Sequence, residues 1–293
     1  MKILITGANG QLGFDLCRTL TDDELIPLTH TECDITSLQS VKDAFMKYRP
    51  DIVINTAAYV RVDDCEDHQD DAFRVNALGA RNVAVACEGT GAKLVHISTD
   101  YVFGGEEKAA NIPYTEFDYP VPLNVYGKSK LAGEEMVRHL CHKYLIVRVS
   151  GLFGVAGSSG KGGNFIETIL RLAKTRPELK VVNDQVFSPS ATQDVARKIR
   201  ELVSTEYYGI VHVTNRGSCS WYDFTQEILR LAGISTPLYP ITSAEYPQKA
   251  KRPSYSVLDN YQLRLLKMDD MFTWQEALRS YMVEKGYLNP ASP

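Results

Sequence analysis

The chain has 293 residues, of which 44% are hydrophobic and 23% charged, and its net charge is -4. This composition is typical of a soluble globular protein, and the slightly negative charge gives no electrostatic support for nucleic-acid binding. Apolar runs such as "KILIT" and "DIVIN" are far shorter than the ~20 residues that span a bilayer, and the N-terminus shows no signal region. We therefore expect a cytoplasmic protein with no membrane or nucleic-acid partner.

Through the first half of the chain, short β-branched runs alternate with longer amphipathic runs. The expected strands are Lys2 to Thr6, Glu24 to Leu28, Asp51 to Asn55, Lys93 to Ile97 and Tyr144 to Val149. The expected helices are Gln11 to Leu20, Leu38 to Tyr48, Asp70 to Glu88 and Val125 to Cys141. This alternation implies right-handed crossovers and a parallel sheet covered by helices on both faces. It predicts a doubly wound, Rossmann-type α/β domain over residues 1–150.

After Ser150 the alternation breaks at "GLFGVAGSSGKGGN", which has the composition of a long flexible loop. Helices are expected from about Phe165 and Thr192, and strands at Leu179 to Val182 and in "GIVHVT". We expect residues 179–215 to return to the first domain. Residues 151–178 and 216–293 would then form mainly a smaller substrate-binding lobe.

The stretch "ITGANGQLG" places Gly7, Gly10 and Gly13 where the first strand turns into the first helix. Glycines at this spacing permit a tight turn, a close approach of backbone amides to a pyrophosphate, and close packing of helix on sheet. The helix start at Gln11 and Leu12 would offer unpaired N–H groups to the anion. A merely tight turn is the alternative, but the strand-turn-helix context favours a dinucleotide site.

The end of the second strand bears on which dinucleotide binds. An acid there would bond the ribose hydroxyls of NAD and repel the additional phosphate of NADP. The sequence has Thr29 and His30 instead, and no acid before Glu32. We expect NADPH as the cofactor, with NADH also permitted.

Two hydroxyls, Ser98 and Thr99, end the fourth strand, at the edge where doubly wound sheets bind ligands. On the following helix, Tyr126 and Lys130 in "NVYGKSK" are four residues apart and so share one face. By spacing alone, this pair fits an ordinary amphipathic helix better than a catalytic pair, because Tyr-x-x-x-Lys occurs by chance in many chains.

Together these motifs resemble the extended short-chain dehydrogenase/reductase family. The glycine turn, "NTAAY", "ISTDYVF" and "LNVYGKSKLAGE" occur in the order and spacing of that family. Further blocks are similar to those of its dTDP-4-dehydrorhamnose reductases: "AAYVRVDDCE", "VNALGARNVA", "GGNF", "NDQVFSPS", "SCSWYDF" and "RPSYSVLDN". The resemblance covers nearly the whole chain.

The resemblance implies a reductase that transfers hydride from NADPH or NADH to the C4 keto group of a nucleotide-linked sugar, giving dTDP-L-rhamnose. In that reaction Tyr126 would protonate the sugar oxygen, and Thr99 would polarise the carbonyl. Lys130 would hold the nicotinamide ribose and lower the tyrosine pKa, which is about 10 in free tyrosine.

The resemblance also assigns further contacts. Those expected at the cofactor are Asp34, Ile35, Ala57, Ala58 and Tyr59. Those expected at the substrate are Asp100, Tyr101, Asn164 and Arg252. Asp100 and Tyr101 could instead only shape the loop, Asn164 could cap a helix, and Arg252 could be an ordinary surface residue.

Competing functions share this fold. A dehydratase would have Glu after Asp100, where this chain has Tyr101, whereas an epimerase or a regulatory NADP-binding subunit stays open. Gly151 stands where many of these reductases have a tryptophan, so the sugar pocket could differ. Gln193 replaces an expected glutamate, so we expect no metal, and either a monomer or a homodimer.

Overall fold

A six-stranded parallel sheet forms the centre of the molecule in a computed structural model, which describes residues 1–105, 112–157 and 163–289. Its strand order is β10-β5-β4-β3-β1-β2, with the crossover reversal of a doubly wound fold. The strands are β1 (Lys2–Thr6), β2 (Glu24–Leu28), β3 (Ile52–Asn55), β4 (Lys93–Thr99), β5 (Tyr144–Val149) and β10 (Gly209–His212). The fold class expected from the alternating pattern is confirmed.

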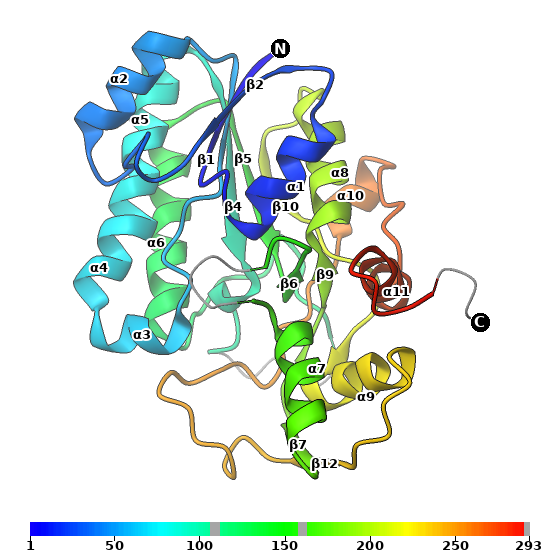
Figure 1. Cartoon of the computed structure of the whole chain (residues 1–293). Helices are drawn as coiled ribbons and strands as arrows, with labels where there is room; N and C mark the ends of the chain where they lie inside the picture. The colour runs from blue at the N-terminus through cyan, green and yellow to red at the C-terminus, as the bar shows by residue number, and fades with distance from the viewer. Residues whose placement is uncertain (106–111, 158–162, 290–293) are drawn as a thin grey trace.

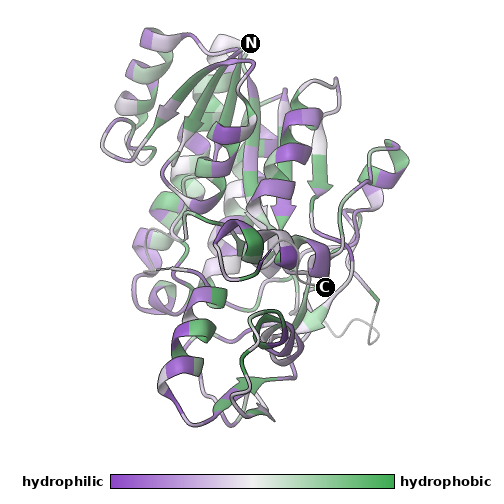
Figure 2. Ribbon diagram, turned by 45° about the vertical axis from the view of Figure 1, so that its right-hand side comes forward, coloured by the Kyte–Doolittle hydropathy of each residue, from purple (hydrophilic) through white to green (hydrophobic). Residues whose placement is uncertain are grey.

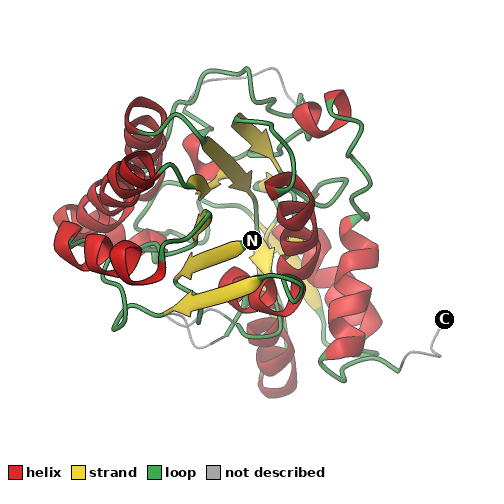
Figure 3. Ribbon diagram, turned by 90° about the horizontal axis from the view of Figure 1, so that it is seen from above, coloured by secondary structure: helices red, strands yellow, loops and turns green. Residues whose placement is uncertain are grey.

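Helices cover both faces of this sheet (Figures 1 and 3). One face packs against α1 (Gln11–Thr19) and α8 (Thr192–Val203), and the other against α2 (Leu38–Tyr48), α5 (Ala80–Thr90) and α6 (Val125–Leu140). Alternate strand residues enter opposite cores: Ile3 and Ile5 face α1, and Leu4 faces α2. Because helices cover both faces of the sheet, its inner strands are mostly apolar, and Figure 2 shows green along much of the sheet.

The helix expected from Asp70 to Glu88 is present as one continuous helical run, but it is not α-helical throughout. The chain forms α3 (Val62–Asp67), α4 (Gln69–Phe73), a π-helical segment η1 (Arg74–Gly79) and then α5. In η1 the side chain of Asn76 accepts the N–H of Tyr59 at 2.8 Å and donates to Ser129 Oγ on α6 at 2.9 Å. These bonds accompany the wider π turn and tie it to the loop after β3.

A smaller lobe lies below the carboxyl ends of the strands (Figure 1). It contains α7 (Phe165–Thr175), α9 (Trp221–Leu231) and three short strand pairs around a separate core. The pairs are β6 (Leu152–Phe153) with β9 (Ser190–Ala191), β8 (Val186–Phe187) with β11 (Cys219–Ser220), and β7 (Leu179–Val182) with β12 (Leu238–Ile241). Helices α10 (Tyr261–Leu265) and α11 (Trp274–Glu284) complete the chain.

The segment 179–215 is divided between the small lobe and the domain of the central sheet. Strand β7 pairs with β12 in the small lobe, whereas α8 packs on α1 and β10 extends the central sheet beside β5. Of the glycine-rich loop at 151–164, residues 158–162 lie outside the described part of the chain. Within the described ranges, no helix is both long and apolar enough to cross a membrane.

Candidate active site

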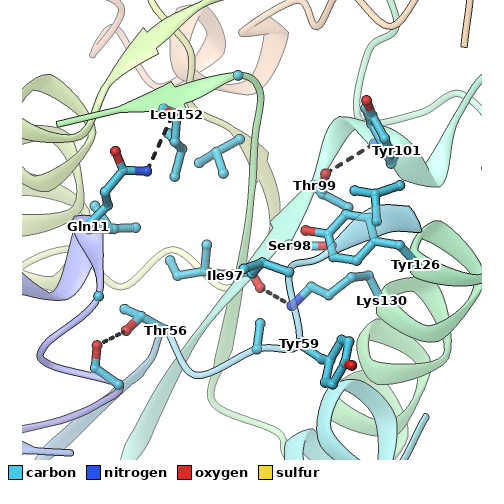
Figure 4. A pocket seen from close by; sticks show the side chains of 18 of the residues that line it. Gln11, Thr56, Tyr59, Ile97, Ser98, Thr99, Tyr101, Tyr126, Lys130 and Leu152 are labelled. Atoms are coloured by element: carbon cyan, nitrogen blue, oxygen red, sulfur yellow. Dashed lines mark hydrogen bonds between the residues drawn. The ribbon is translucent and has the colours of Figure 1, made fainter. Parts of the chain in front are cut away.

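A cavity of about 990 Å³ opens between the carboxyl ends of the central strands and the small lobe. Its wall includes the glycine turn after β1, the end of β4, the first turns of α6 and the aromatic side of the small lobe. Figure 4 shows Tyr126 and Lys130 projecting from α6 toward Ser98, Thr99 and the backbone of Ile97. The cavity thus joins motifs that are more than a hundred residues apart in the chain.

The glycine turn leaves the start of α1 open to an anion. Gly7 has a φ of 70°, and a Cβ on Gly13 would lie 2.4 Å from the Gly7 carbonyl oxygen. Gly10 is the N-cap of α1 and has no side chain to occupy the free amides of the first turn. The Gln11 side chain joins β6, donating to the Leu152 carbonyl and accepting from the Gly154 N–H.

The loop after β2 also lines the cavity, with His30, Asp34 and Ile35. Thr29 is not part of the cavity wall, and its N–H and hydroxyl both donate to the Glu32 carboxylate, at 2.8 and 2.7 Å. Arg74 from the π segment lines the cavity as well and pairs with Asp71 at 2.8 Å. Sequence reasoning missed this arginine, since an exposed arginine in a helical pattern gives no signal.

The loop after β3 supplies Ala57, Ala58 and Tyr59 to the same wall. Tyr59 is fixed at both ends: its backbone binds the Asn76 amide, and its hydroxyl donates to Asp64 at 2.7 Å. This loop therefore forms a rigid side of the cavity between the glycine turn and α6.

Helix α6 brings Tyr126 and Lys130 into the cavity because its first turn is firmly held. The Asn124 side chain caps the helix by accepting the Gly127 N–H at 2.8 Å, and its amide donates to the Lys251 carbonyl. Gly127 itself permits close packing, since a Cβ there would lie 2.1 Å from the Tyr101 carbonyl oxygen. Sequence spacing predicted the shared face, and the structure places both side chains on it.

In this geometry burial, rather than Lys130, dominates the pKa of Tyr126. The Lys130 ammonium donates to the Ile97 carbonyl at 2.6 Å, and burial is the main influence that raises the pKa of Tyr126, although a hydrogen bond with Thr99 lowers it. Burial also lowers the pKa of Lys130 to about 8, against an opposing influence of Glu134. Tyr126 is accordingly protonated at neutral pH, which suits a proton donor.

The end of β4 is organised around the buried carboxylate of Asp100. It accepts hydrogen bonds from Ser256 Oγ at 2.6 Å, Ser150 Oγ at 2.9 Å and Thr99 Oγ1 at 3.1 Å. Burial raises the pKa of Asp100 to about 6 in spite of these donors. The residue lines the cavity and also joins three distant segments, so both roles left open by the sequence are compatible with its position.

Two residues expected at the substrate have protein partners as well. Arg252 lines the cavity, and its guanidinium makes a bidentate ion pair with Asp63 at 2.9 and 2.7 Å. Asn164 caps α7 in a capping box, and its amide donates to the Gly154 carbonyl and the Tyr281 hydroxyl. Arg252 is therefore not an isolated surface residue, and Asn164 has the capping function.

Gly151 lies against an aromatic wall that the sequence did not reveal. Its φ is 51°, and a Cβ there would lie 2.4 Å from the Phe187 ring. The ring of Phe187 stacks on Trp221 with a centroid distance of 3.9 Å, and Phe165 lies 4.6 Å from the same indole. All three rings line the cavity, so aromatic surface from β8, α7 and α9 borders the space beside Gly151.

Comparison with known proteins gives a consistent result over the whole chain. Residues 1–286 match the family model described as the RmlD substrate binding domain. A dTDP-4-dehydrorhamnose reductase of Aggregatibacter actinomycetemcomitans is 38% identical over 95% of this chain and 97% of its own length. The spore coat polysaccharide biosynthesis protein SpsK of Bacillus subtilis is 43% identical over 97% of this chain and 98% of its own length.

A solved structure shows the same likeness in three dimensions. The crystal structure of a dTDP-4-dehydrorhamnose reductase from Bacillus anthracis, in complex with NADP, superposes with a TM-score of 0.91. The two chains are 42% identical, and the match covers 97% of this chain and 99% of that one.

Proposed function

This chain belongs to the RmlD substrate binding domain family, and from that premise we propose that it is an NADPH-dependent reductase of a nucleotide-linked 4-keto sugar. The substrate that fits best is dTDP-4-dehydro-L-rhamnose, reduced to dTDP-L-rhamnose. The observation that carries the proposal is that the uncapped glycine turn lines the same cavity as Thr99, Tyr126 and Lys130.

The residues around the glycine turn fit a dinucleotide. The amides at the start of α1 would hold its pyrophosphate, since helix N-termini bind anions through unpaired N–H groups. Asp34 and Ile35 would contact the adenosine, with the side chains of His30 and Arg74 nearby as hydrogen-bond donors for a 2′-phosphate. When bound, NADPH supplies the hydride that reduces the sugar carbonyl.

The protein side chains would manage the proton. Tyr126, kept neutral by burial, would donate its hydroxyl proton to the oxygen at sugar C4, and Thr99 would hold that oxygen in place. Lys130 would bind the ribose hydroxyls of the cofactor and favour the phenolate that Tyr126 becomes after donation. The hydrogen bond between Thr99 and Tyr126 already joins two of these groups.

The small lobe would bind the nucleotide sugar, while residues 1–150 with α8 and β10 would bind the dinucleotide. Asp100, Tyr101 and Asn164 line the cavity and would border the sugar. Arg252 would recognise the diphosphate, because a guanidinium matches phosphate oxygens bidentately. We propose that the protein acts in the cytoplasm, as a monomer or a homodimer.

The direct test is oxidation of NADPH by the purified protein with dTDP-4-dehydro-L-rhamnose. Tyr126→Phe should lose nearly all turnover yet still bind NADPH. Tyr239→Phe, an exposed tyrosine on β12, is the matched control and should keep full activity. Cofactor binding without turnover on any 4-keto sugar would instead support a regulatory subunit, and full activity of Tyr126→Phe would contradict the proton assignment.

A further inference from the structure

One helical turn beyond Lys130, the face of α6 that lines the cavity carries a buried acidic residue, Glu134. Tyr126, Lys130 and Glu134 follow one another at intervals of four, so their side chains lie one turn apart on the same face. Glu134 has no exposed surface, and Lys130 is 2% exposed. A fully buried carboxylate is uncommon without a partner, and the proposed reaction does not use this one directly.

The Glu134 carboxylate is held by two neighbouring strands. Arg148 on β5 donates to both of its oxygens, at 2.9 and 2.7 Å, and Ser98 Oγ on β4 donates to Oε1 at 2.5 Å. Ser98 and Arg148 are directly paired in the β4–β5 register. Ser98 also immediately precedes Thr99, so Glu134 joins the catalytic helix to the strand end that holds the third active-site group.

Charged and titratable groups face this cluster from each side. On β4, buried His96 faces Lys130, and on β10, buried His212 faces Arg148. Arg148 also lies over the Phe103 ring, 5.1 Å from its centroid. Tyr126 and Asp100 are at the cavity end of the same group.

Glu134 is therefore one carboxylate between two cations, Lys130 and Arg148. Its charge opposes the burial that lowers the Lys130 pKa to about 8. Without that charge, Lys130 would lose its neighbouring anion and face an unpaired guanidinium across the strands. Both effects disfavour the ammonium form.

We propose that Glu134 is a positioning residue for the reduction, which keeps Lys130 in its ammonium form and aligns α6 with the end of β4. This inference rests on the role proposed for Lys130 in the preceding section. Arg148 has the opposite effect: it fixes the Glu134 carboxylate, and its positive charge limits how strongly Glu134 stabilises the ammonium of Lys130.

The test compares three variants by the pH dependence of kcat/KM, which reports the free enzyme. In Glu134→Gln the alkaline limb, where activity falls as Lys130 loses its proton, should move to lower pH by up to about two units, as a unit charge at the usual i,i+4 separation of about 6 Å and an effective dielectric of about 20 predicts. In Arg148→Gln the Glu134 carboxylate loses its other cationic partner and stabilises the Lys130 ammonium more strongly, so the alkaline limb should move to higher pH. Glu135→Gln, an exposed neighbour paired with Arg138, should leave the limb unchanged.

A second measurement does not depend on turnover. The Lys130 pKa can be followed in the cofactor-free protein by NMR of the lysine Cε–Hε groups, with Lys130→Met identifying the signal. The Lys130 pKa should fall in Glu134→Gln and rise in Arg148→Gln. Because this readout needs no substrate, it tests the inference even if the wild type reduces no 4-keto sugar, which would overturn only the proposed function.

Removing one partner of a buried pair can prevent folding. The double variant Glu134→Gln/Arg148→Met removes both members of the buried ion pair and leaves no unpaired guanidinium, and in it the Lys130 pKa should still fall, by less than in Glu134→Gln. A purely structural role predicts that both single variants lose stability with no opposite movement of the limb or of the Lys130 pKa. Shifts in the same direction, or an unchanged Lys130 pKa in the double variant, would overturn the proposal.

Discussion

Gly13 offers a quantitative test of the phosphate-binding turn. An alanine Cβ there would lie 2.4 Å from the Gly7 carbonyl oxygen and 2.8 Å from the Ala8 Cα. Both atoms belong to the backbone, so no side-chain rotation can relieve the contact. The start of α1 must move away from β1, and with it the amides proposed to bind the pyrophosphate.

The size of the effect follows from the packing. Overpacking a tight core costs about 1–3 kcal/mol, and alanine regains up to about 1 kcal/mol over glycine within a helix. We therefore expect Gly13→Ala to destabilise the protein by about 1–2 kcal/mol. Loss of one hydrogen bond from a backbone amide to the charged phosphate should weaken binding by about 1.5–3 kcal/mol, so the NADPH Kd should rise at least about tenfold.

The assay is urea unfolding together with NADPH titration by fluorescence. Gly89→Ala is the matched control, because Gly89 lies in α5 and no atom lies within 4 Å of its Cβ position. It should stabilise the protein by about 0.5–1 kcal/mol and leave the NADPH Kd unchanged. Wild-type stability and affinity in Gly13→Ala, or equal losses in Gly89→Ala, would refute the reasoning.

Three further predictions concern the rest of the cavity. Burial raises the pKa of Asp100 from 3.8 to about 6, so the folded state binds more protons between these values and stability falls as pH rises through them. The unfolding free energy of Asp100→Asn, measured in urea and compared with that of wild type, should therefore rise by up to about 3 kcal/mol between about pH 4 and pH 7. A difference between the two proteins that does not change with pH would argue against a raised Asp100 pKa. Gly151→Ala should displace Phe187, raising the substrate KM with an unchanged NADPH Kd, and an unchanged substrate KM would show that the ring does not border the sugar. Arg252→Ala should raise the substrate KM at least about tenfold, and the exposed-residue control Lys251→Ala should not; equal KM values would remove the diphosphate assignment.

Local spacing in the sequence was enough for the parts of the protein that depend on neighbouring residues. Apolar runs separated by amphipathic runs gave the central strands and most of the flanking helices, because burial on one or both faces imposes its period on the chain. The spacing of Gly7, Gly10 and Gly13 gave the open turn, and the interval from Tyr126 to Lys130 gave their shared face. Their roles in the reaction stay predictions.

Tertiary structure alone decided which distant residues meet. Asp63 pairs with Arg252, Asp100 collects hydroxyls from Ser150 and Ser256, and Phe187 fills the space beside Gly151. None of these contacts leaves a periodic trace in the chain, since each depends on how separate elements dock. Burial set the ionisation in the same way: the family resemblance implied a lowered Tyr126 pKa, but sequence motifs carry no information about desolvation, which raises it.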